Sequence, residues 1–246
     1  MRYLIVSDLH SNWEALEAVL CAASGQYEST LCCGDLVGYG ADPNAVTDWA
    51  KTTLTAVVRG NHDRASVGLD DLEWFNASAR AAALWTEREL TPENNAYIRA
   101  LPRGPVQVEG FHMVHGSPLD EDEYLVDSTE AEAAFQYAAA PLIFFGHTHI
   151  QGGFIWRREG VEVVTHPAWH GGAASLQLEP DTAYMVNPGS VGQPRDNDPR
   201  AAFCFYDSES RVLTWRRLEY DIPKAQDKIR RAGLPAVLAD RLAVGR

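Results

Sequence analysis

Acidic, amide and histidine side chains follow five short apolar segments that have the character of buried strands. These residues stand in the order Asp8-Leu9-His10, Gly34-Asp35, Gly60-Asn61-His62-Asp63, His115-Gly116 and Gly146-His147-Thr148-His149. The carboxyl ends of strands in an open sheet face one crevice. The polar side chains that follow these strands are therefore expected to meet in a single site.

The residue types in this set are ones that bind transition metals. Extended residues two apart point to the same side, so each pair, Asp8 with His10 and His147 with His149, can aim two donors into one pocket. Carboxylate oxygens and neutral imidazoles bind Mn, Fe, Zn or Ni. The absence of cysteine from the set argues against a structural zinc site.

A single motif of this kind occurs often by chance, but the whole set is specific. Five of the eight histidines fall within these motifs. Buried polar groups are unfavourable unless they find partners, so a purely structural role leaves their concentration at strand ends unexplained. The pattern favours a metal centre.

Apolar strands alternate with helices through the first part of the chain. Strands are predicted over residues 3–7, 29–33 and 55–58, with helices over 12–23 and 42–51. Such alternation indicates a parallel sheet covered by helices. Further strands are predicted over 106–109, 111–115 and 142–145, a helix over 128–139, and hairpins over 153–165 and 202–218. The chain is predicted to form one α/β domain, residues 1–246, as a layered sandwich with two sheets.

Residues 64–102 are predicted to be a helical insertion in this domain. Trp74, Ala77, Ala81, Leu84 and Trp85 keep helical spacing, and Thr91-Pro92 is a helix start signal. Two interpretations stay open for this segment. Its aromatic side chains serve packing, or the segment forms a lid over a substrate.

Charge and hydropathy limit the partners. The formal net charge of −13 disfavours nonspecific binding to nucleic acid, which needs clustered Lys and Arg, but bound metals still allow a small phosphorylated substrate. The first apolar run is too short for a signal peptide or a membrane span. A cytoplasmic location without membrane association is expected, and the oligomeric state stays open.

The motifs DLH, GDLVGYG, GNHD, VHG and GHTH together resemble those of the calcineurin-like metallophosphoesterase superfamily. They span residues 8–149, and residues 187–192 resemble a later segment of its small bacterial phosphodiesterases. The resemblance implies a four-layer α-β-β-α sandwich with two mixed sheets. It also implies two divalent metal ions, with manganese favoured and iron, zinc or nickel as alternatives.

Carried over position by position, the resemblance implies a complete ligand set for two ions. It assigns Asp8, His10 and His149 to one ion, Asn61, His115 and His147 to the other, and Asp35 to both. His62 is left free to face the substrate, with Asp63 expected to orient its ring through a hydrogen bond. The implied reaction is hydrolysis by a metal-bound hydroxide, with His62 protonating the leaving group near its ordinary pKa of about 6.5.

Three side chains are weaker candidates for substrate binding. Arg59, next to the third motif, fits either a phosphate contact or a structural ion pair. Arg195 follows a glycine-rich turn and fits either the site or an ordinary surface position. Tyr39 occupies the place where phosphoprotein phosphatases and diadenosine tetraphosphate hydrolases of the superfamily carry an arginine. The acidic run over residues 120–123 is expected to be a solvated loop.

The substitution of Tyr39 for arginine favours phosphodiester hydrolysis, because a diester monoanion needs less charge compensation than a monoester. The alternatives are a phosphomonoesterase, or a phosphoprotein or dinucleotide polyphosphate phosphatase. A different class, a non-catalytic protein-binding scaffold of the same fold, is disfavoured because every ligand position is intact.

Overall fold

The computed structural model describes residues 1–246, which form two six-stranded sheets. The first sheet has the order β3-β2-β1-β11-β12-β9. Its strands are β1 (Arg2–Val6), β2 (Ser29–Cys32), β3 (Ala56–Val57), β9 (Ala173–Gln177), β11 (Ala201–Asp207) and β12 (Val212–Leu218). β1, β2 and β3 are parallel, because helices connect them, whereas the other pairings are antiparallel.

The second sheet has the order β4-β5-β6-β10-β7-β8. Its strands are β4 (Val106–Val108), β5 (Phe111–Met113), β6 (Leu142–Phe144), β7 (Gly152–Arg157), β8 (Gly160–Thr165) and β10 (Ala183–Asn187). β5, β6 and β10 are parallel, and the remaining pairs are antiparallel. Both sheets are therefore mixed, as expected. The sequence did not predict β9 and β10, which pair only with strands distant in the chain.

Helices complete the layers. They are α1 (Trp13–Ala23), α2 (Pro43–Thr53), α3 (Asn61–Ala65), α4 (Ala77–Glu89), α5 (Pro92–Arg99), α6 (Ser128–Phe135), α7 (Ile222–Arg231) and α8 (Ala236–Asp240), with the short 3-10 helices η1 (Leu72–Trp74) and η2 (Arg241–Val244). Side-chain caps begin several of them: Asn12 accepts from the Ala15 amide, and Thr91 accepts from the Asn94 amide. The helix predicted over residues 128–139 ends earlier, at Phe135.

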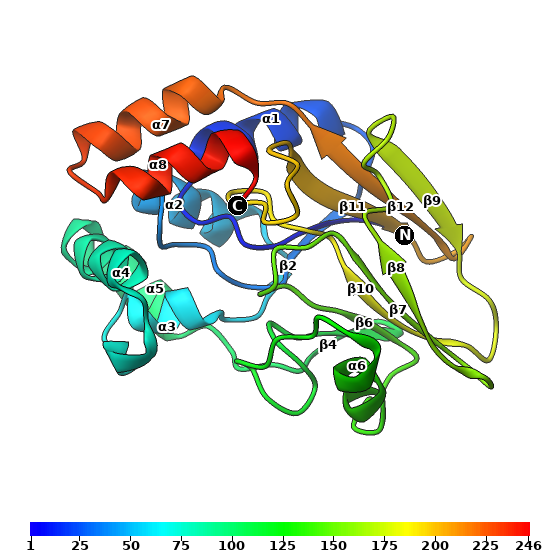
Figure 1. The fold of residues 1–246 in the computed structure, drawn as a ribbon. Helices are drawn as coiled ribbons and strands as arrows, with labels where there is room; N and C mark the ends of the chain where they lie inside the picture. The colour runs from blue at the N-terminus through cyan, green and yellow to red at the C-terminus, as the bar shows by residue number, and fades with distance from the viewer.

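Alternation along β1 shows how the layers meet. Leu4 and Val6 belong to the core under α1 and α2, whereas Tyr3 and Ile5 belong to the core between the two sheets. A third cluster, which contains Phe135 of α6, covers the outer face of the second sheet. Figure 1 shows α1 and α6 on opposite sides of the paired sheets. The predicted four-layer sandwich is confirmed.

The segment predicted to be a helical insertion contains η1, α4 and α5. Trp85 packs against a hydrophobic cluster with residues from α4, α7 and α8, whereas Trp74 is 92% exposed. Packing thus accounts for one tryptophan of this segment and not for the other.

None of the helices combines the length and the apolar character needed to cross a membrane. The cytoplasmic location stays a prediction.

Candidate metal centre

The predicted ligands lie in loops that follow strands of both sheets. Asp8 and His10 follow β1, Asp35 follows β2, and Asn61 begins α3 after β3. In the second sheet His115 follows β5, and the pair His147 and His149 follows β6. Because β1, β2 and β3 are parallel, and β5 and β6 are parallel, these loops converge at one end of the sandwich.

The backbone at this end is strained. Five of the seven predicted ligands adopt left-handed backbone conformations: Asp8 (φ 52°), His10 (47°), Asp35 (54°), His147 (66°) and His149 (59°). Such conformations cost about 1–3 kcal/mol each for residues other than glycine, and they cluster at functional sites. The strained loops allow close approach, and a Cβ added at Gly60 would overlap the Asp35 carboxylate. Local stability is therefore lower where these side chains are brought together.

Two histidines face each other through atoms that both carry lone pairs. His10 Nδ1 donates to the Val37 carbonyl at 3.0 Å, and His149 Nδ1 donates to the Gln193 carbonyl at 2.5 Å. Burial lowers the pKa of both rings well below the ordinary value, so both are neutral. A neutral ring with its proton on Nδ1 has only a lone pair on Nε2. The two Nε2 atoms are nevertheless 3.0 Å apart, an arrangement that needs a cation between or beside them.

Two carboxylates complete this cluster. Ligand atoms of Asp8, His10, Asp35 and His149 all lie within 4.8 Å of one another, and all four residues are buried. Asp8 Oδ2 and Asp35 Oδ2 have no hydrogen-bond partner. Buried carboxylate oxygens without hydrogen-bond partners are unfavourable, so both oxygens are suited to binding a cation. Burial raises the pKa of Asp8 to about 7.

A second group of ligands lies on the other side of Asp35. Its carboxylate Oδ2 is 3.5 Å from His10 Nε2 and 3.4 Å from His115 Nε2, so it stands between the two groups. His115 Nε2 is 3.2 Å from Asn61 Oδ1, and the His115 and His147 rings are 4.8 Å apart. His147 donates from Nε2 to the Asp122 carbonyl at 3.1 Å, which leaves its Nδ1 lone pair free for a ligand.

The second group is electrostatically different from the first. Burial lowers the pKa of His115, but the Asp35 carboxylate outweighs burial and raises it to about 10. Burial raises the pKa of Asp35, but His115 outweighs it and leaves that pKa well below its usual value. The two side chains form an ion pair, with His115 Nε2 3.4 Å from Asp35 Oδ2. Nitrogen and oxygen donors of this kind fit a divalent transition metal at each group.

His62 follows Asn61 at the start of α3 and lines a pocket together with Asn61 and His147. Its ring packs against Tyr39 at a centroid distance of 4.3 Å and against Phe75 at 5.1 Å, and its Nδ1 has no partner. Burial lowers the pKa of His62 to about 4, so the expectation of titration near 6.5 is wrong for the ligand-free protein.

The expected hydrogen bond from Asp63 to the His62 ring is also wrong. The Asp63 oxygens accept instead from the Val37 amide at 3.2 Å and the Gly60 amide at 2.9 Å. Asp63 is the third residue of α3, so its carboxylate reaches back to the open amides at the helix start more readily than to the neighbouring ring. It holds the start of α3, which carries Asn61 and His62.

The substrate-binding candidates Arg59 and Arg195 have different surroundings in the structure. Arg59 donates to Glu121 at 2.9 and 2.8 Å, so the structure supports the ion-pair alternative and not the phosphate contact. Glu121 also pairs with Arg64, and its side chain is only 11% exposed, so the solvated-loop expectation is wrong at this position. Arg195 lies at the site, where its guanidinium donates to the Tyr39 hydroxyl at 3.2 Å.

Sequence reasoning missed three contributors from loops. Tyr124 packs against His147 with ring centroids 3.9 Å apart, and the carbonyls of Asp122 and Gln193 fix the rings of His147 and His149. Backbone carbonyls leave no signal in residue type. The only sequence signal for Tyr124 is its position next to the acidic run over residues 120–123.

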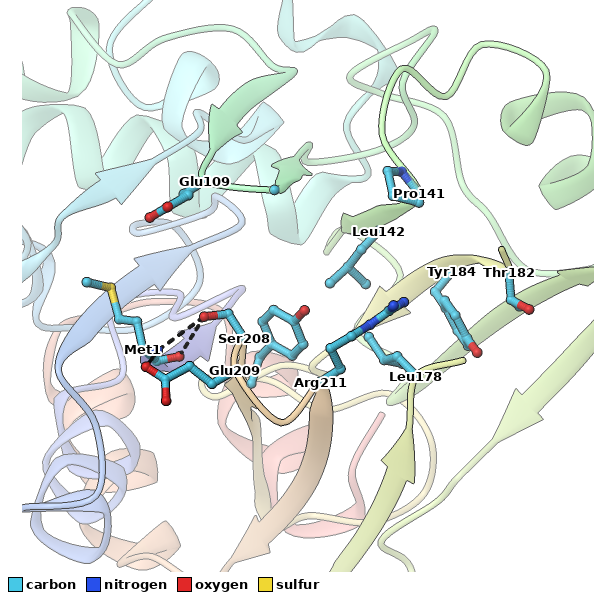
Figure 2. Close-up of a pocket in the computed structure, with 12 residues that line it drawn as sticks. Met1, Glu109, Pro141, Leu142, Leu178, Thr182, Tyr184, Ser208, Glu209 and Arg211 are labelled. Carbon is cyan, nitrogen blue, oxygen red and sulfur yellow. Dashed lines mark hydrogen bonds and ion pairs between the residues drawn. The ribbon is translucent and has the colours of Figure 1, made fainter. Parts of the chain in front are cut away.

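A larger cavity, of about 560 Å³, lies at the opposite end of the sandwich. It is lined at the starts of β1, β5, β6 and β10, as the positions of Met1, Gly110, Leu142 and Tyr184 show. Figure 2 shows Arg211 near Leu142 and Tyr184, with Met1 hydrogen-bonded to Ser208 and Glu209 at the other side. No predicted ligand lines this cavity.

Comparisons with known proteins agree with this geometry. A family model for the calcineurin-like phosphoesterase superfamily domain matches residues 1–211. An uncharacterized protein of Methanocaldococcus jannaschii is 36% identical over 248 residues, covering 98% of this chain and 97% of that protein.

Solved structures of other proteins share this fold. A metallophosphoesterase from Sphaerobacter thermophilus has a TM-score of 0.86 and 36% identity, covering 100% of this chain and 99% of that one. A hypothetical protein from Pyrococcus horikoshii has a TM-score of 0.78 and 20% identity, covering 100% and 98%, and supports the fold alone.

Proposed function

The chain belongs to the calcineurin-like phosphoesterase superfamily, and on this basis we propose that it hydrolyses phosphodiesters with two divalent metal ions. The observation that carries the proposal is the pair of opposed Nε2 lone pairs of His10 and His149, 3.0 Å apart and buried beside two carboxylates. Two neutral rings whose Nδ1 atoms both donate to carbonyls cannot satisfy that geometry, because each Nε2 then carries only a lone pair. A bound cation satisfies it.

The residues divide between two ions that share one carboxylate. Asp8, His10 and His149 would hold one ion, Asn61, His115 and His147 the other, and Asp35 both. Manganese is the favoured ion, with iron, zinc and nickel as alternatives of the same ligand preference. When bound, such ions activate water and neutralise the charge on a phosphate.

His62 is proposed to protonate the leaving oxygen, because it is buried, free of ligands at Nδ1 and next to Asn61. Its pKa of about 4 makes the ring neutral before substrate binds. A phosphate anion close to the ring favours the protonated form and raises that pKa. Asp63 keeps His62 in place through the start of α3.

Arg195 and Tyr39 are proposed to orient the phosphate. The Arg195 guanidinium lies 5.6 Å from the centre of the Tyr39 ring, and its hydrogen-bond partners, Tyr39 and Gln193, include no carboxylate. Its positive charge is therefore available to an anion. One Arg195 nitrogen, Nη2, already donates to both Tyr39 and Gln193, so the guanidinium has fewer free donors for a phosphate than an unpaired bidentate arginine has. The weaker charge compensation suits a diester monoanion.

The same arginine supports a second candidate function, phosphomonoester hydrolysis. Arg195 adds a positive charge beside Tyr39, at the position where Tyr39 alone would offer only a neutral hydroxyl. A dianion would gain more from that charge than a monoanion would.

Substrate profiling tests the proposal. One manganese-loaded preparation is assayed with bis-p-nitrophenyl phosphate, p-nitrophenyl phosphate and a phosphopeptide. We expect the highest kcat/KM for the diester. A clear preference for the monoester or the phosphopeptide would replace diester hydrolysis by the second candidate. Loss of metal binding together with absence of all three activities would favour a scaffold role.

A further inference from the structure

A pocket of about 310 Å³ opens beside the second ligand group. Asn61, His62 and His147 are among the residues that line it, together with the aromatic side chains Tyr39, Trp74, Phe75 and Tyr124. Its volume falls at the lower end of the range for small-molecule sites, about 300–1,000 Å³. A phosphate at the metal centre would therefore have one of its ester groups in this pocket.

The pocket is walled by aromatic rings. The Tyr124 ring packs against His147 at a tilt of 33°, and Phe75 meets the His62 ring edge-on at an angle of 78°. Trp74 is 92% exposed and packs against no part of the core, although an indole is among the largest apolar side chains. Aromatic faces at a cleft bind planar rings by stacking, which is worth about 1–3 kcal/mol for a nucleic acid base.

The charge of the pocket excludes some ligands. Asp70, Asp71 and Asp122 line it, with Arg64 as the single cation. Arg64 already pairs with Asp70 and Asp122, at 2.7 and 2.8 Å. A polyphosphate or a nucleic acid strand would be repelled by this excess of carboxylates. An uncharged planar ring with N–H donors matches both the aromatic walls and the acceptor oxygens.

The wall that carries Trp74 is formed before any ligand binds. Asp71 accepts from the Glu73 amide at 3.0 Å, and Asn76 accepts from the amides of Ser78 and Ala79 at 3.1 and 3.0 Å. With the Arg64–Asp70 ion pair, these bonds fix both ends of η1. A preformed wall reduces the ordering cost of binding.

We propose that this pocket binds the uncharged nitrogen heterocycle of a nucleotide ester, so that the P–O bond to the sugar breaks and the nucleoside carrying that base leaves as its hydroxyl form, protonated by His62. The proposal rests on the proposed phosphoesterase function for the position of the phosphate. It assigns to the exposed Trp74 the role of a stacking face, with Tyr124 and Phe75 as further walls. The helical segment thereby contributes to substrate selection.

Binding of two matched probes tests this. Adenosine 5′-monophosphate and ribose 5-phosphate share the sugar and phosphate and differ in the base, so titration calorimetry of the manganese-loaded protein isolates the base. We expect adenosine 5′-monophosphate to bind about 5- to 150-fold more tightly, the affinity equivalent of the stacking energy. Trp74→Ala should remove most of that difference, and Trp74→Phe should keep much of it.

Trp169→Ala is the matched control, because Trp169 is 48% exposed and does not line the pocket. It should leave both affinities unchanged. Equal affinity of the wild-type protein for the two probes, or an unchanged difference in Trp74→Ala, would overturn the proposal. Hydrolysis of bis-p-nitrophenyl phosphate by the same preparation reports the phosphoesterase separately, so its failure is distinguishable from failure of the pocket.

Discussion

The two ends of the sandwich differ in what their cavities contain. At the amino ends of β1, β5 and β6, the cavity of about 560 Å³ is lined by groups such as the Met1 ammonium and Glu209, whose side chains are 50% and 89% exposed. At the carboxyl ends, the pocket is only about 310 Å³, but carboxylates and imidazoles are buried beside it without partners. Cavity size alone would therefore select the wrong end.

Strain and unpaired polar atoms identify the functional end better than volume does. The left-handed residues of the metal centre and the partnerless oxygens of Asp8 and Asp35 lower the stability of the protein without a ligand. None of the side chains that line the larger cavity has a buried polar atom without a partner. A fold keeps such unfavourable features where a ligand compensates for them.

The largest expected effect is that of Asp35→Asn. The carboxylate stands between both ligand groups, so its neutralisation should lose most bound metal and nearly all activity. Metal analysis of the purified variant checks this. Arg211→Ala, at the larger cavity, is the control and should retain full metal content and activity. Full occupancy of two ions in Asp35→Asn would contradict the bridging role.

His62→Ala should have the second-largest effect on activity. The variant should keep two ions per chain but lose about 10²–10⁴-fold in turnover, the usual contribution of a positioned acid. The loss should be smaller for nitrophenyl esters, whose leaving group needs no proton, than for alkyl esters. Turnover measured on both ester types decides the role, and an equal loss on both would exclude His62 as the acid.

Arg195→Ala should have a smaller effect. Loss of a charged hydrogen bond of about 1.5–3 kcal/mol predicts a decrease in kcat/KM of roughly 10- to 150-fold. Arg195→Lys keeps the charge and should restore part of the activity. A loss confined to monoesters would show that Arg195 serves the second candidate function.

The smallest expected effect is on the pH dependence of metal binding. Burial lowers the pKa of His115 and the Asp35 carboxylate raises it, to about 10 overall, so the ring is protonated at pH 7.5 without metal. A ligating imidazole must be neutral, and binding should therefore release about one proton and strengthen about tenfold per pH unit as pH rises.

Calorimetry of Mn²⁺ binding in two buffers with different ionisation enthalpies measures this proton. Binding that weakens as pH rises would have the wrong sign for this account.

The sequence was sufficient for ten of the twelve strands, most helices and the convergence of seven polar side chains. Runs such as residues 3–7 combine strong strand propensity with a polar residue at the end, and both features are local. β10 could not be found in this way, because its position is set by pairing with the distant strands β6 and β7. Such pairing depends on the rest of the fold.

The details around His62 also depended on geometry that residue types do not encode. Asp63 follows His62 directly, so a bond between them was a natural expectation, but the start of α3 offered backbone donors in better positions. Arg59 forms an ion pair with Glu121, which lies in a loop distant in sequence. The expected partner of Asp63 was therefore wrong, whereas for Arg59 the ion-pair alternative was right but its partner could not be named from the sequence.

The most direct test is anomalous diffraction at the manganese edge from crystals of the manganese-loaded protein. The account predicts two peaks per chain, one beside Nε2 of His10 and His149 and one beside Asn61 and His115, both in contact with Asp35. A chain with no peak at these positions, or with a peak only in the larger cavity near Glu209, would contradict it.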